Sequence, residues 1–442
     1  MKHNIFGTDG IRGLVGAEPF SITSIIKLGM AIGAWAQKTY GTTPVILLGH
    51  DTRESCSLVK AALQTGLLLH KITIYDAQVV PTPTIYQLVT KNPLFNLGII
   101  ISASHNPYHD NGIKLVDAHR GKLSLDDELK LSELFYAQDL NALNYTALGT
   151  TVMWEDAQKE YCATLAEFFP KNFLQNTTIV LDCAHGATYK VAHTIFQSFG
   201  AQVMLINHQP TGTNINQDCG ALHLESLQHA VTLHHADAGF AFDGDGDRVM
   251  AVSRLGQVKN GDDILALLLT HPLYENETGV VGTVMTNQGF EVHARMHNKE
   301  LLRANVGDKY VAELLEKKQM LLGGEQSGHI IVRDYLNTGD GIFTALRTLQ
   351  AMIHTNNWDM ETFEKFPQIL INVPITVKKD LTEPHLAKII TEHEAQLHGG
   401  RVLVRYSGTE LLLRIMIEDS HEETAHSVGN HLSQELIKQL SV

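Results

Sequence analysis

Short apolar runs separated by amphipathic segments recur along the first 366 residues, and this alternation restricts the fold more than any other feature of the chain. In the first 150 residues the runs are Val45–Leu48, Ile72–Tyr75 and Leu97–Ile101. Such runs, bounded by turn residues, predict buried strands, and strands that alternate with helices predict βαβ units. We therefore expect an α/β domain over residues 1–150, with a parallel or mixed sheet covered by helices.

The alternation occurs twice more and then changes after Pro367. Because 442 residues exceed what one core usually supports, we expect several domains. The prediction is three similar α/β domains with mixed sheets, at 1–150, 151–255 and 256–366, and a smaller α+β C-terminal domain at 367–442. The further predicted strands lie near Thr178–Leu181, Gln202–Ile206, Ala238–Phe242, Val280–Met285, Leu301–Asn305, Ile369–Val373, Arg401–Arg405 and Leu411–Glu418. Helices are expected near His385–His398 and at the end of the chain, where Ala425, Val428, Leu432, Leu436 and Leu440 form the buried face.

Composition excludes several classes of partner. The formal charge of −14 argues against nucleic acid and anionic membranes, which bind through excess Lys and Arg. No apolar run approaches the ~18 residues of a membrane span. The four cysteines show no C-x-x-C spacing, and the start of the chain has no apolar signal region, so we expect a cytoplasmic protein. An anionic ligand must then meet locally clustered cations.

The loop Asp243-Gly244-Asp245-Gly246-Asp247-Arg248 directly follows the predicted strand Ala238–Phe242. Glycines between the carboxylates let the backbone curl until one oxygen from each aspartate faces a single point, which suits Mg²⁺ held partly by a phosphate. An EF-hand would need Gly and Glu where the chain has Arg248 and Arg254. A dinucleotide-binding turn would place three aspartates against a pyrophosphate and lacks its third glycine. A solvated acidic turn is the remaining alternative, and it is disfavoured by the strict alternation after a buried strand.

Two further polar loops are expected at the carboxyl ends of strands, Ser102–Pro107 after Ile101 and Gly323–His329 in the third domain. Open α/β sheets place ligands at the carboxyl ends of their strands, so one such loop per domain predicts a shared cleft. The Ser104 hydroxyl should be displayed on a surface turn. Lys114 and Arg12, both beside glycines, are candidate cations for a phosphoryl group. Taken alone, each of these residues is more simply a turn serine or a surface charge.

The segment Arg405–Glu410, with Arg414, places two guanidiniums and two hydroxyls beside a loop between two predicted strands. Arginine matches phosphate geometry, so this segment is a candidate phosphate site. A plain hairpin with surface charges is the alternative.

Together these motifs resemble the α-D-phosphohexomutase superfamily, most closely its bacterial phosphoglucosamine mutase branch, in order and over essentially the whole chain. The motifs are Gly7–Gly13, Ser102–Lys114, Asp243–Arg248, Gly324–His329 and Arg405–Glu410. The resemblance implies four domains around a central cleft and a phosphorylated serine at Ser104. It assigns catalysis to Ser104, Lys114, Arg12, Arg248 and His329; Mg²⁺ to phosphoserine 104, Asp243, Asp245 and Asp247; and substrate binding to Glu325, Ser327, His329, Arg405, Ser407, Gly408, Thr409 and Arg414.

The implied activity is the interconversion of glucosamine 6-phosphate and glucosamine 1-phosphate through a bisphosphorylated sugar. Glucosamine or glucose 1,6-bisphosphate would be the activator, and the product would feed UDP-N-acetylglucosamine and cell-wall precursor synthesis. Gln326 favours the glucosamine branch, because phosphomannomutase and phosphoglucomutase relatives often carry Met there. Leu411 stands where the family commonly has Pro, which removes no ligand. The alternatives are a phosphomannomutase or phosphoglucomutase, a phosphate-ester hydrolase, and a non-catalytic sugar-phosphate-binding protein; a homodimer is left open.

Overall fold

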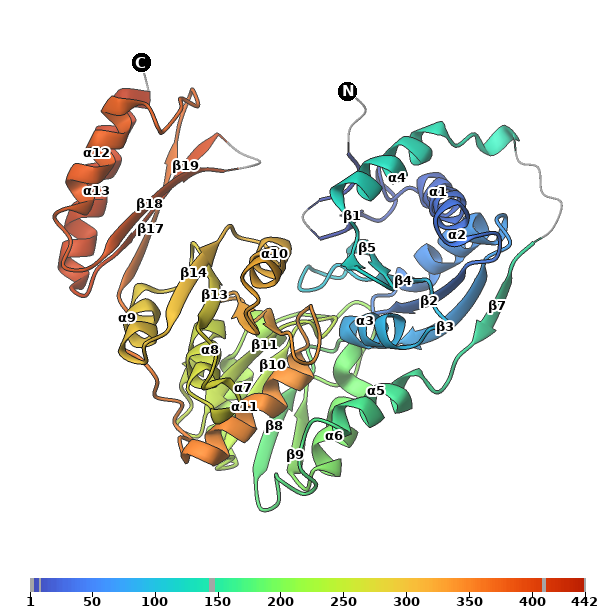
Figure 1. The fold of residues 1–442 in the computed structure, drawn as a ribbon, viewed down its shortest axis with the longest axis horizontal. Coiled ribbons are helices and arrows are strands. Elements are labelled where there is room, and N and C mark those ends of the chain that lie inside the picture. The colour runs from blue at the N-terminus through green and yellow to red at the C-terminus, as the bar shows by residue number, and fades with distance from the viewer. Residues whose placement is uncertain (1–3, 8, 143–147, 408–410, 441–442) are drawn as a thin grey trace.

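The computed structural model describes residues 4–7, 9–142, 148–407 and 411–440. Within these ranges the strands form three mixed sheets and one smaller antiparallel sheet, in chain order, each accompanied by its own helices (Figure 1). The predicted architecture of three α/β units and a smaller α+β unit is confirmed. None of the described helices is both long and apolar enough to cross a bilayer.

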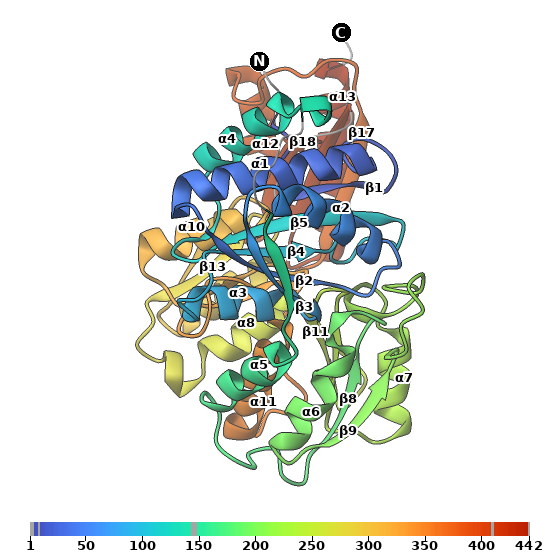
Figure 2. The same ribbon diagram turned by 90° about the vertical axis from the view of Figure 1, so that its right-hand side faces the viewer.

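The first sheet has the strand order β1-β5-β4-β2-β3-β7, with β6 beside β5. Alternate residues of β2 are buried on opposite faces of the sheet. Ile46 and Leu48 belong to the core between the sheet and helices α1 and α2, and Leu47 belongs to the core on the side of α3. Figure 2 shows α1 and α2 on one side of this sheet and α3 on the other. A continuous apolar run is what a strand covered on both faces requires. The elements are β1 (Ile11–Leu14), α1 (Ile22–Tyr40), β2 (Val45–His50), α2 (Cys56–Leu68), β3 (Thr73–Val79), α3 (Thr82–Lys91), β4 (Leu97–Ile101), β5 (Asp110–Asp117), β6 (Gly121–Lys122), α4 (Leu125–Ala137) and β7 (Thr150–Met153).

The second and third sheets have the orders β12-β11-β10-β8-β9 and β14-β13-β15-β16. Helices α8 and α11 contribute to one apolar core that includes residues of both sheets. The elements of the second unit are α5 (Ala157–Ala166), β8 (Thr178–Asp182), α6 (Ala192–Ser198), β9 (Gln202–Ile206), α7 (Glu225–Leu233), β10 (Ala238–Phe242), β11 (Val249–Ser253) and β12 (Val258–Lys259). Those of the third are α8 (Gly261–Leu269), β13 (Gly279–Thr283), α9 (Gln288–Met296), β14 (Glu300–Ala304), α10 (Asp308–Lys318), β15 (Leu322–Gly324), β16 (Ile330–Val332) and α11 (Gly341–Thr355). Short 3₁₀ helices lie at Leu140–Ala142, Ala187–Lys190, Gly220–Leu222 and Pro272–Tyr274.

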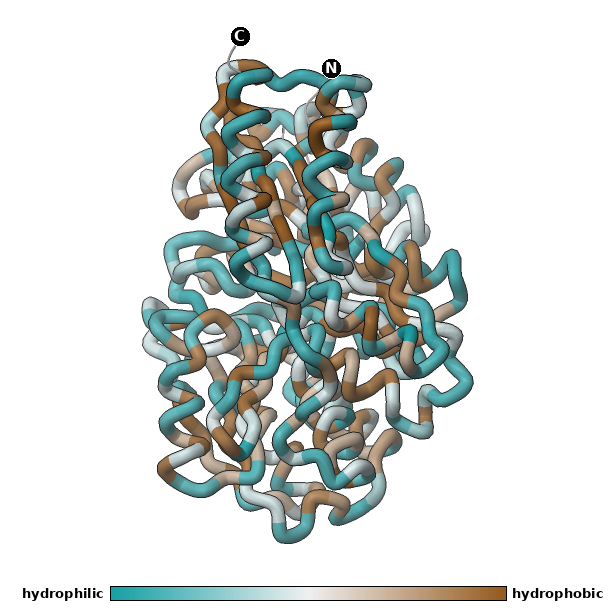
Figure 3. Tube along the Cα trace, turned by 90° about the vertical axis from the view of Figure 1, so that its left-hand side faces the viewer, coloured by the Kyte–Doolittle hydropathy of each residue, from teal (hydrophilic) through white to brown (hydrophobic). Residues whose placement is uncertain are grey.

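The small C-terminal unit has an antiparallel sheet of order β17-β19-β18, and helices α12 and α13 pack against it. Seen from outside in Figure 3, both helices alternate hydrophilic and hydrophobic segments, as expected for helices that bury one face. The predicted buried residues of the last helix, from Ala425 to Leu440, are all buried. The elements are β17 (Gln368–Pro374), α12 (Pro384–Glu394), β18 (Arg401–Tyr406), β19 (Leu412–Glu418) and α13 (Glu422–Leu440).

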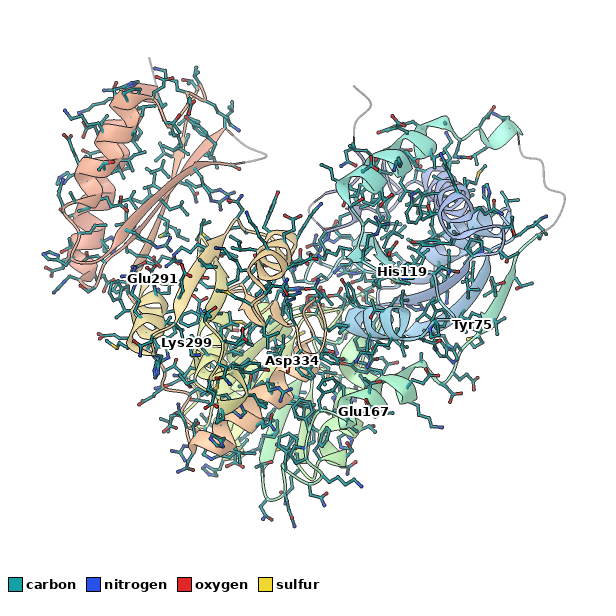
Figure 4. The ribbon with its side chains drawn as sticks, in the orientation of Figure 1. Tyr75, His119, Glu167, Glu291, Lys299 and Asp334 are labelled. Atoms are coloured by element: carbon teal, nitrogen blue, oxygen red, sulfur yellow. The ribbon has the colours of Figure 1, made fainter. Side chains whose placement is uncertain are left out.

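The small unit is attached to the third unit. Arg401 donates to the carbonyls of Val284 (2.8 Å) and Thr286 (2.9 Å), which follow β13. Glu291 of α9, labelled in Figure 4, lies at this junction and pairs with Arg303 at 3.2 Å. The small unit therefore lies beside α9 and β14, away from the first sheet (Figure 1).

The three predicted site loops occupy equivalent places in the three mixed sheets. Each joins a parallel strand to an antiparallel neighbour: β4 to β5, β10 to β11, and β15 to β16. The loops therefore leave the carboxyl ends of strands, where open α/β sheets bind ligands. The second and third of these loops meet where the amide of Val249, at the start of β11, donates to the carbonyl of Gly328 at 3.0 Å.

Candidate active site

The three aspartates of the loop after β10 converge on one point, as predicted. One carboxylate oxygen from each of Asp243, Asp245 and Asp247 lies within 4.8 Å of the others, and all three residues are buried. Both glycines are needed for this curl. Gly246 has a φ of +76°, and a Cβ on Gly244 would lie 2.6 Å from the carbonyl oxygen of Ser104.

Asp245 Oδ1, within this cluster, has no hydrogen-bond partner in the described part of the chain. Asp245 Oδ2 accepts hydrogen bonds from Thr82 Oγ1 (2.6 Å) and Lys114 Nζ (3.0 Å), but the buried Asp245 Oδ1 accepts none from the described residues. A buried acceptor without a partner is costly, and a hard cation would satisfy it. The all-oxygen donor set therefore fits a cation of the Mg²⁺ type.

The carboxylates differ in their affinity for protons. Burial and the neighbouring charges of Asp247 and Asp245 raise the pKa of Asp243 well above its ordinary value. Burial acts the same way on Asp247, but Lys114 and His329 outweigh it and hold that pKa well below the ordinary value. Neighbouring carboxylates in a buried site thus raise the pKa of one aspartate, while nearby cations lower the pKa of another.

Ser104 is buried, contrary to the prediction of a serine displayed on a surface turn. It is 1% exposed, and its hydroxyl donates to Asp243 Oδ2 at 2.5 Å. Its φ is +53°, a conformation that non-glycine residues rarely adopt. The carbonyl of Ser104 accepts from Arg53 Nη2 (2.8 Å) and Asn216 Nδ2 (2.9 Å). Strained backbone held by several partners is typical of functional positions.

The predicted cations lie around this cluster. Lys114 Nζ is 3.0 Å from both Asp245 Oδ2 and Asp247 Oδ2 and 2.9 Å from Asp9 Oδ2. Burial opposes its charge, but these carboxylates raise the pKa of Lys114 well above its ordinary value. Arg12 pairs with Asp9 at 3.1 Å, and Arg248 Nε lies 3.9 Å from Asp247 Oδ1. Lys114 is therefore a buried lysine in ion pairs, and not a solvated charge on the surface.

A cleft of about 950 Å³ opens beside the cluster. Its lining includes Arg12, His105, Arg248, Glu325 and His329, which come from the first three units. The shared cleft expected from one loop per domain is thus present for these three loops.

The loop after β15 contributes the candidate sugar-binding side chains. Glu325 Oε1 accepts from the amide of Gly307 at 3.0 Å, which fixes its carboxylate at the cleft. His329 Nε2 accepts from the amide of Gly339 at 3.0 Å, and its Nδ1 lies 3.5 Å from Asp247 Oδ1. Ser327 is half-buried on the same loop and is not among the residues that line the cleft.

Gln326 is not among the residues that line the cleft. Its side chain is hydrogen-bonded to the carboxylate of Asp262, and its carbonyl accepts from the amide of Gly261 at 3.1 Å. Burial raises the pKa of Asp262 to about 6. Gln326 therefore attaches the loop to the start of α8, and any effect on sugar choice is transmitted through the loop.

The candidate phosphate site lies apart from the other three loops. Arg405 and Arg414 face each other across the β18–β19 register, and Arg414 Nη2 lies 3.5 Å from Ser407 Oγ. Gly408 and Thr409 are outside the described residues. No described residue of the small unit lines the cleft, although the connected ends of β18 and β19 face the first unit (Figure 1).

Sequence reasoning missed the groups that hold Ser104. Asp51 Oδ2 accepts from Ser102 Oγ (2.7 Å) and Arg53 Nε (2.8 Å), and Arg53 in turn binds the Ser104 carbonyl. His105 Nδ1 lies 3.4 Å from Ser104 Oγ, and burial, with the charges of Arg248 and Arg12, lowers the pKa of His105 to about 4. A usable signal was present, since Asp51 and Arg53 directly follow a buried strand, as the other site loops do.

Family profiles and individual relatives, compared with the whole chain, point to the same protein family. Sequence profiles of the phosphoglucomutase/phosphomannomutase family match in order: alpha/beta/alpha domain I at residues 3–142, domain II at 159–256, domain III at 260–368 and the C-terminal domain at 370–432. A phosphoglucosamine mutase of Campylobacter curvus is 40% identical over 448 residues, which cover 99% of each chain.

Two solved structures share the fold. A phosphoglucomutase/phosphomannomutase family protein from Burkholderia thailandensis superposes with a TM-score of 0.81 at 20% identity, covering 100% of this chain and 99% of that one. The N-acetylphosphoglucosamine mutase of Aspergillus fumigatus, solved with GlcNAc-6P and magnesium, gives a TM-score of 0.71 at 16% identity and covers 99% and 96%. From its four matching domains and its full-length relative, the chain belongs to the phosphoglucomutase/phosphomannomutase family.

Proposed function

We propose that this chain is a phosphoglucosamine mutase, which interconverts glucosamine 6-phosphate and glucosamine 1-phosphate in the cytoplasm. The observation that carries the proposal is the Ser104 hydroxyl, directed at Asp243 Oδ2 at 2.5 Å within a buried aspartate triad. A serine held this way beside a cation site is suited to carry a phosphoryl group. The full-length similarity to phosphoglucosamine mutases supports the choice of sugar.

The proposed reaction consists of two successive phosphoryl transfers. In the first, the bond between phosphorus and Ser104 Oγ breaks, a bond from phosphorus to the free sugar hydroxyl forms, and that hydroxyl loses its proton. The bisphosphorylated sugar then reverses its orientation. In the second transfer the bond between the other phosphorus and its sugar oxygen breaks, that phosphoryl group passes to Ser104 Oγ, the released sugar oxygen takes up a proton, and phosphoserine is regenerated. A sugar 1,6-bisphosphate supplies the first phosphoryl group to an unphosphorylated enzyme.

Charge balance explains the cations around Ser104. A phosphoserine carries about −1.5 to −2 charges, which would lie beside three aspartates. Asp243, Asp245 and Asp247 would hold Mg²⁺ together with the phosphoserine, and that ion would withdraw charge from the phosphoryl group during transfer. Lys114, Arg12 and Arg248 surround the same region and stabilise the remaining negative charge.

The two candidate proton carriers are not equivalent. Lys114 Nζ lies within 3.0 Å of carboxylate oxygens of Asp9, Asp245 and Asp247, so its N–H groups already have acceptors. We assign proton exchange with the sugar hydroxyl to His329, which lines the cleft and has a side chain that can gain and lose a proton near neutral pH. Glu325 and Ser327 are assigned to the sugar hydroxyls.

The phosphate that is not being transferred is assigned to Arg405, Ser407, Gly408, Thr409 and Arg414. These residues belong to the small unit, so binding requires the small unit to approach the cleft. Charge-assisted hydrogen bonds from two guanidiniums supply the attraction.

The decisive experiment compares sugars with the purified full-length enzyme. We expect kcat/KM for glucosamine 6-phosphate to exceed that for mannose and glucose phosphates by a wide margin, with no turnover by the Ser104→Ala variant. Equal or better turnover of mannose phosphate would assign the chain to the phosphomannomutase branch. Release of inorganic phosphate without isomer formation would instead indicate a hydrolase.

A further inference from the structure

A second cluster of metal-ligating side chains lies outside the active site, in the small unit. His398, Asp419 and His421 each offer a ligand atom within 4.8 Å of the others. They come from two segments: His398 precedes β18, whereas Asp419 and His421 lie two residues apart in the loop between β19 and α13. The fold thus places one group at the open start of β18 beside two groups of the loop that leads from β19 into the last helix.

The carboxylate of this cluster is held in place by backbone. Asp419 is fully buried; its Oδ1 accepts from the amide of His421 at 2.8 Å, and its Oδ2 accepts from the amide of His398. The position of the carboxylate relative to both histidines is therefore set before any ligand binds. Because the carboxylate is already ordered, less conformational entropy is lost when an ion binds.

The spacing fits a tetrahedral ion. The Nδ1 atoms of His398 and His421 lie 3.7 Å and 3.6 Å from Asp419 Oδ1. Zinc bonds to nitrogen and oxygen of about 2.0–2.1 Å put the ligands of a tetrahedral site about 3.4 Å apart. Rotation of the imidazoles needs to move each Nδ1 atom by only a few tenths of an ångström to close these two distances, and the two imidazole ligand atoms lie within 4.8 Å of each other.

The imidazoles are accessible. The side chains of His398 and His421 are 63% and 67% exposed, and their ring centroids are 5.1 Å apart. Ser420 Oγ lies 3.0 Å from His421 Nδ1, but its proton has an alternative acceptor in the carbonyl of His398 at 3.2 Å. Both rings can therefore present a lone pair to an ion from solvent.

We propose that His398, Asp419 and His421 form a site for a divalent transition metal of the Zn²⁺ class, with water completing the coordination. Two imidazoles and one carboxylate favour such ions, whereas the all-oxygen triad of the active site favours Mg²⁺. The amide of Asp419 donates to the carbonyl of Pro367 at 3.3 Å, so the ion would bind where the small unit joins the third unit. It would link the segment before β18 to the loop between β19 and α13 and stabilise the folded small unit.

The test uses Zn²⁺ as the probe and the full-length enzyme in a large excess of Mg²⁺, which competes with Zn²⁺ for the active-site triad. Isothermal titration and metal analysis after dialysis measure affinity and the number of bound ions. We expect His398→Ala and His421→Ala each to lose one bound Zn²⁺ per chain. The loss in affinity should exceed the roughly 10-fold that even an outer-shell partner contributes.

His426→Ala is the matched control, because His426 is also exposed on α13 but lies outside the cluster. This variant should bind Zn²⁺ as the wild type does. All three substitutions are at exposed side chains, and mutase turnover in Mg²⁺ should be unchanged, which verifies folding. Unchanged Zn²⁺ affinity and stoichiometry in both His398→Ala and His421→Ala would overturn the proposal, as would a wild type that binds no Zn²⁺ at micromolar concentrations.

Discussion

Replacing Gly244 with alanine should impair phosphoryl transfer by moving Ser104, without touching a charged group. A Cβ at this position would lie 2.6 Å from the Ser104 carbonyl oxygen and 2.7 Å from Asn216 Nδ2, whereas ordinary contacts begin at 3.4 Å. Gly244 does not have a positive φ, so alanine brings no backbone strain of its own. Ser104 and the aspartate loop must separate by about 0.8 Å to relieve the closest contact. A misplacement of about 1 Å reduces turnover by roughly 100-fold, and overpacking lowers the free energy of unfolding by about 1–3 kcal/mol.

The matched control is Gly279→Ala at the amino end of β13, where a Cβ would lie 2.1 Å from the carbonyl oxygen of Glu300. This variant should lose at least as much stability, yet keep a kcat close to that of the wild type. Initial rates of mutase turnover, measured below the unfolding temperature of both variants, give the comparison. The reasoning fails if Gly244→Ala turns over normally while folded, or if Gly279→Ala loses kcat to the same extent.

Three further predictions concern residues outside the aspartate loop. Arg414→Ala should raise KM for both phosphate isomers by about 10- to 100-fold, since a charge-assisted hydrogen bond contributes about 1.5–3 kcal/mol; an unchanged KM would remove the small unit from substrate binding. Gln326→Met should lower kcat/KM for all sugars by a similar factor, because Gln326 contacts Asp262 rather than the cleft, and a change in sugar preference alone would contradict this. Burial raises the pKa of Asp340 to about 6, so the folded state binds this proton more tightly than the unfolded state, and the contribution of Asp340 to stability falls as pH rises from about 4 to about 6. In urea unfolding, the free energy of unfolding of Asp340→Asn should therefore rise relative to that of the wild type over this pH range, by about 1.4 kcal/mol per unit of pKa shift. A difference between the two proteins that does not change with pH would refute the assignment.

The parts of the fold that could be predicted from sequence are those with a local pattern. β9 and β10 have the predicted bounds, because each is a short apolar run between turn residues. β7 was missed because all four of its residues are exposed, so no burial pattern marks it, and only pairing with β3 defines it. Local pattern also predicted the convergence of the aspartates, since glycine spacing and the preceding strand lie within ten residues.

The environment of Ser104 could not be predicted in the same way. Its burial depends on Arg53 and Asn216, which are 51 and 112 residues away in sequence. The separation of the small unit from the cleft depends on contacts such as that of Arg401 with Val284, 117 residues apart. No periodicity in the chain encodes contacts at these separations. The motif order indicated which loops belong together, but not how far apart they lie.

The most direct test of the central claim is the site of the covalent phosphate. The full-length enzyme would be incubated with glucose 1,6-bisphosphate carrying a labelled phosphate, then digested and analysed by mass spectrometry. We expect the label on Ser104 alone, discharge of that label onto added glucosamine phosphate, and no label or turnover with Ser104→Ala. Label on Ser102 or elsewhere, with Ser104→Ala retaining normal turnover, would contradict the account.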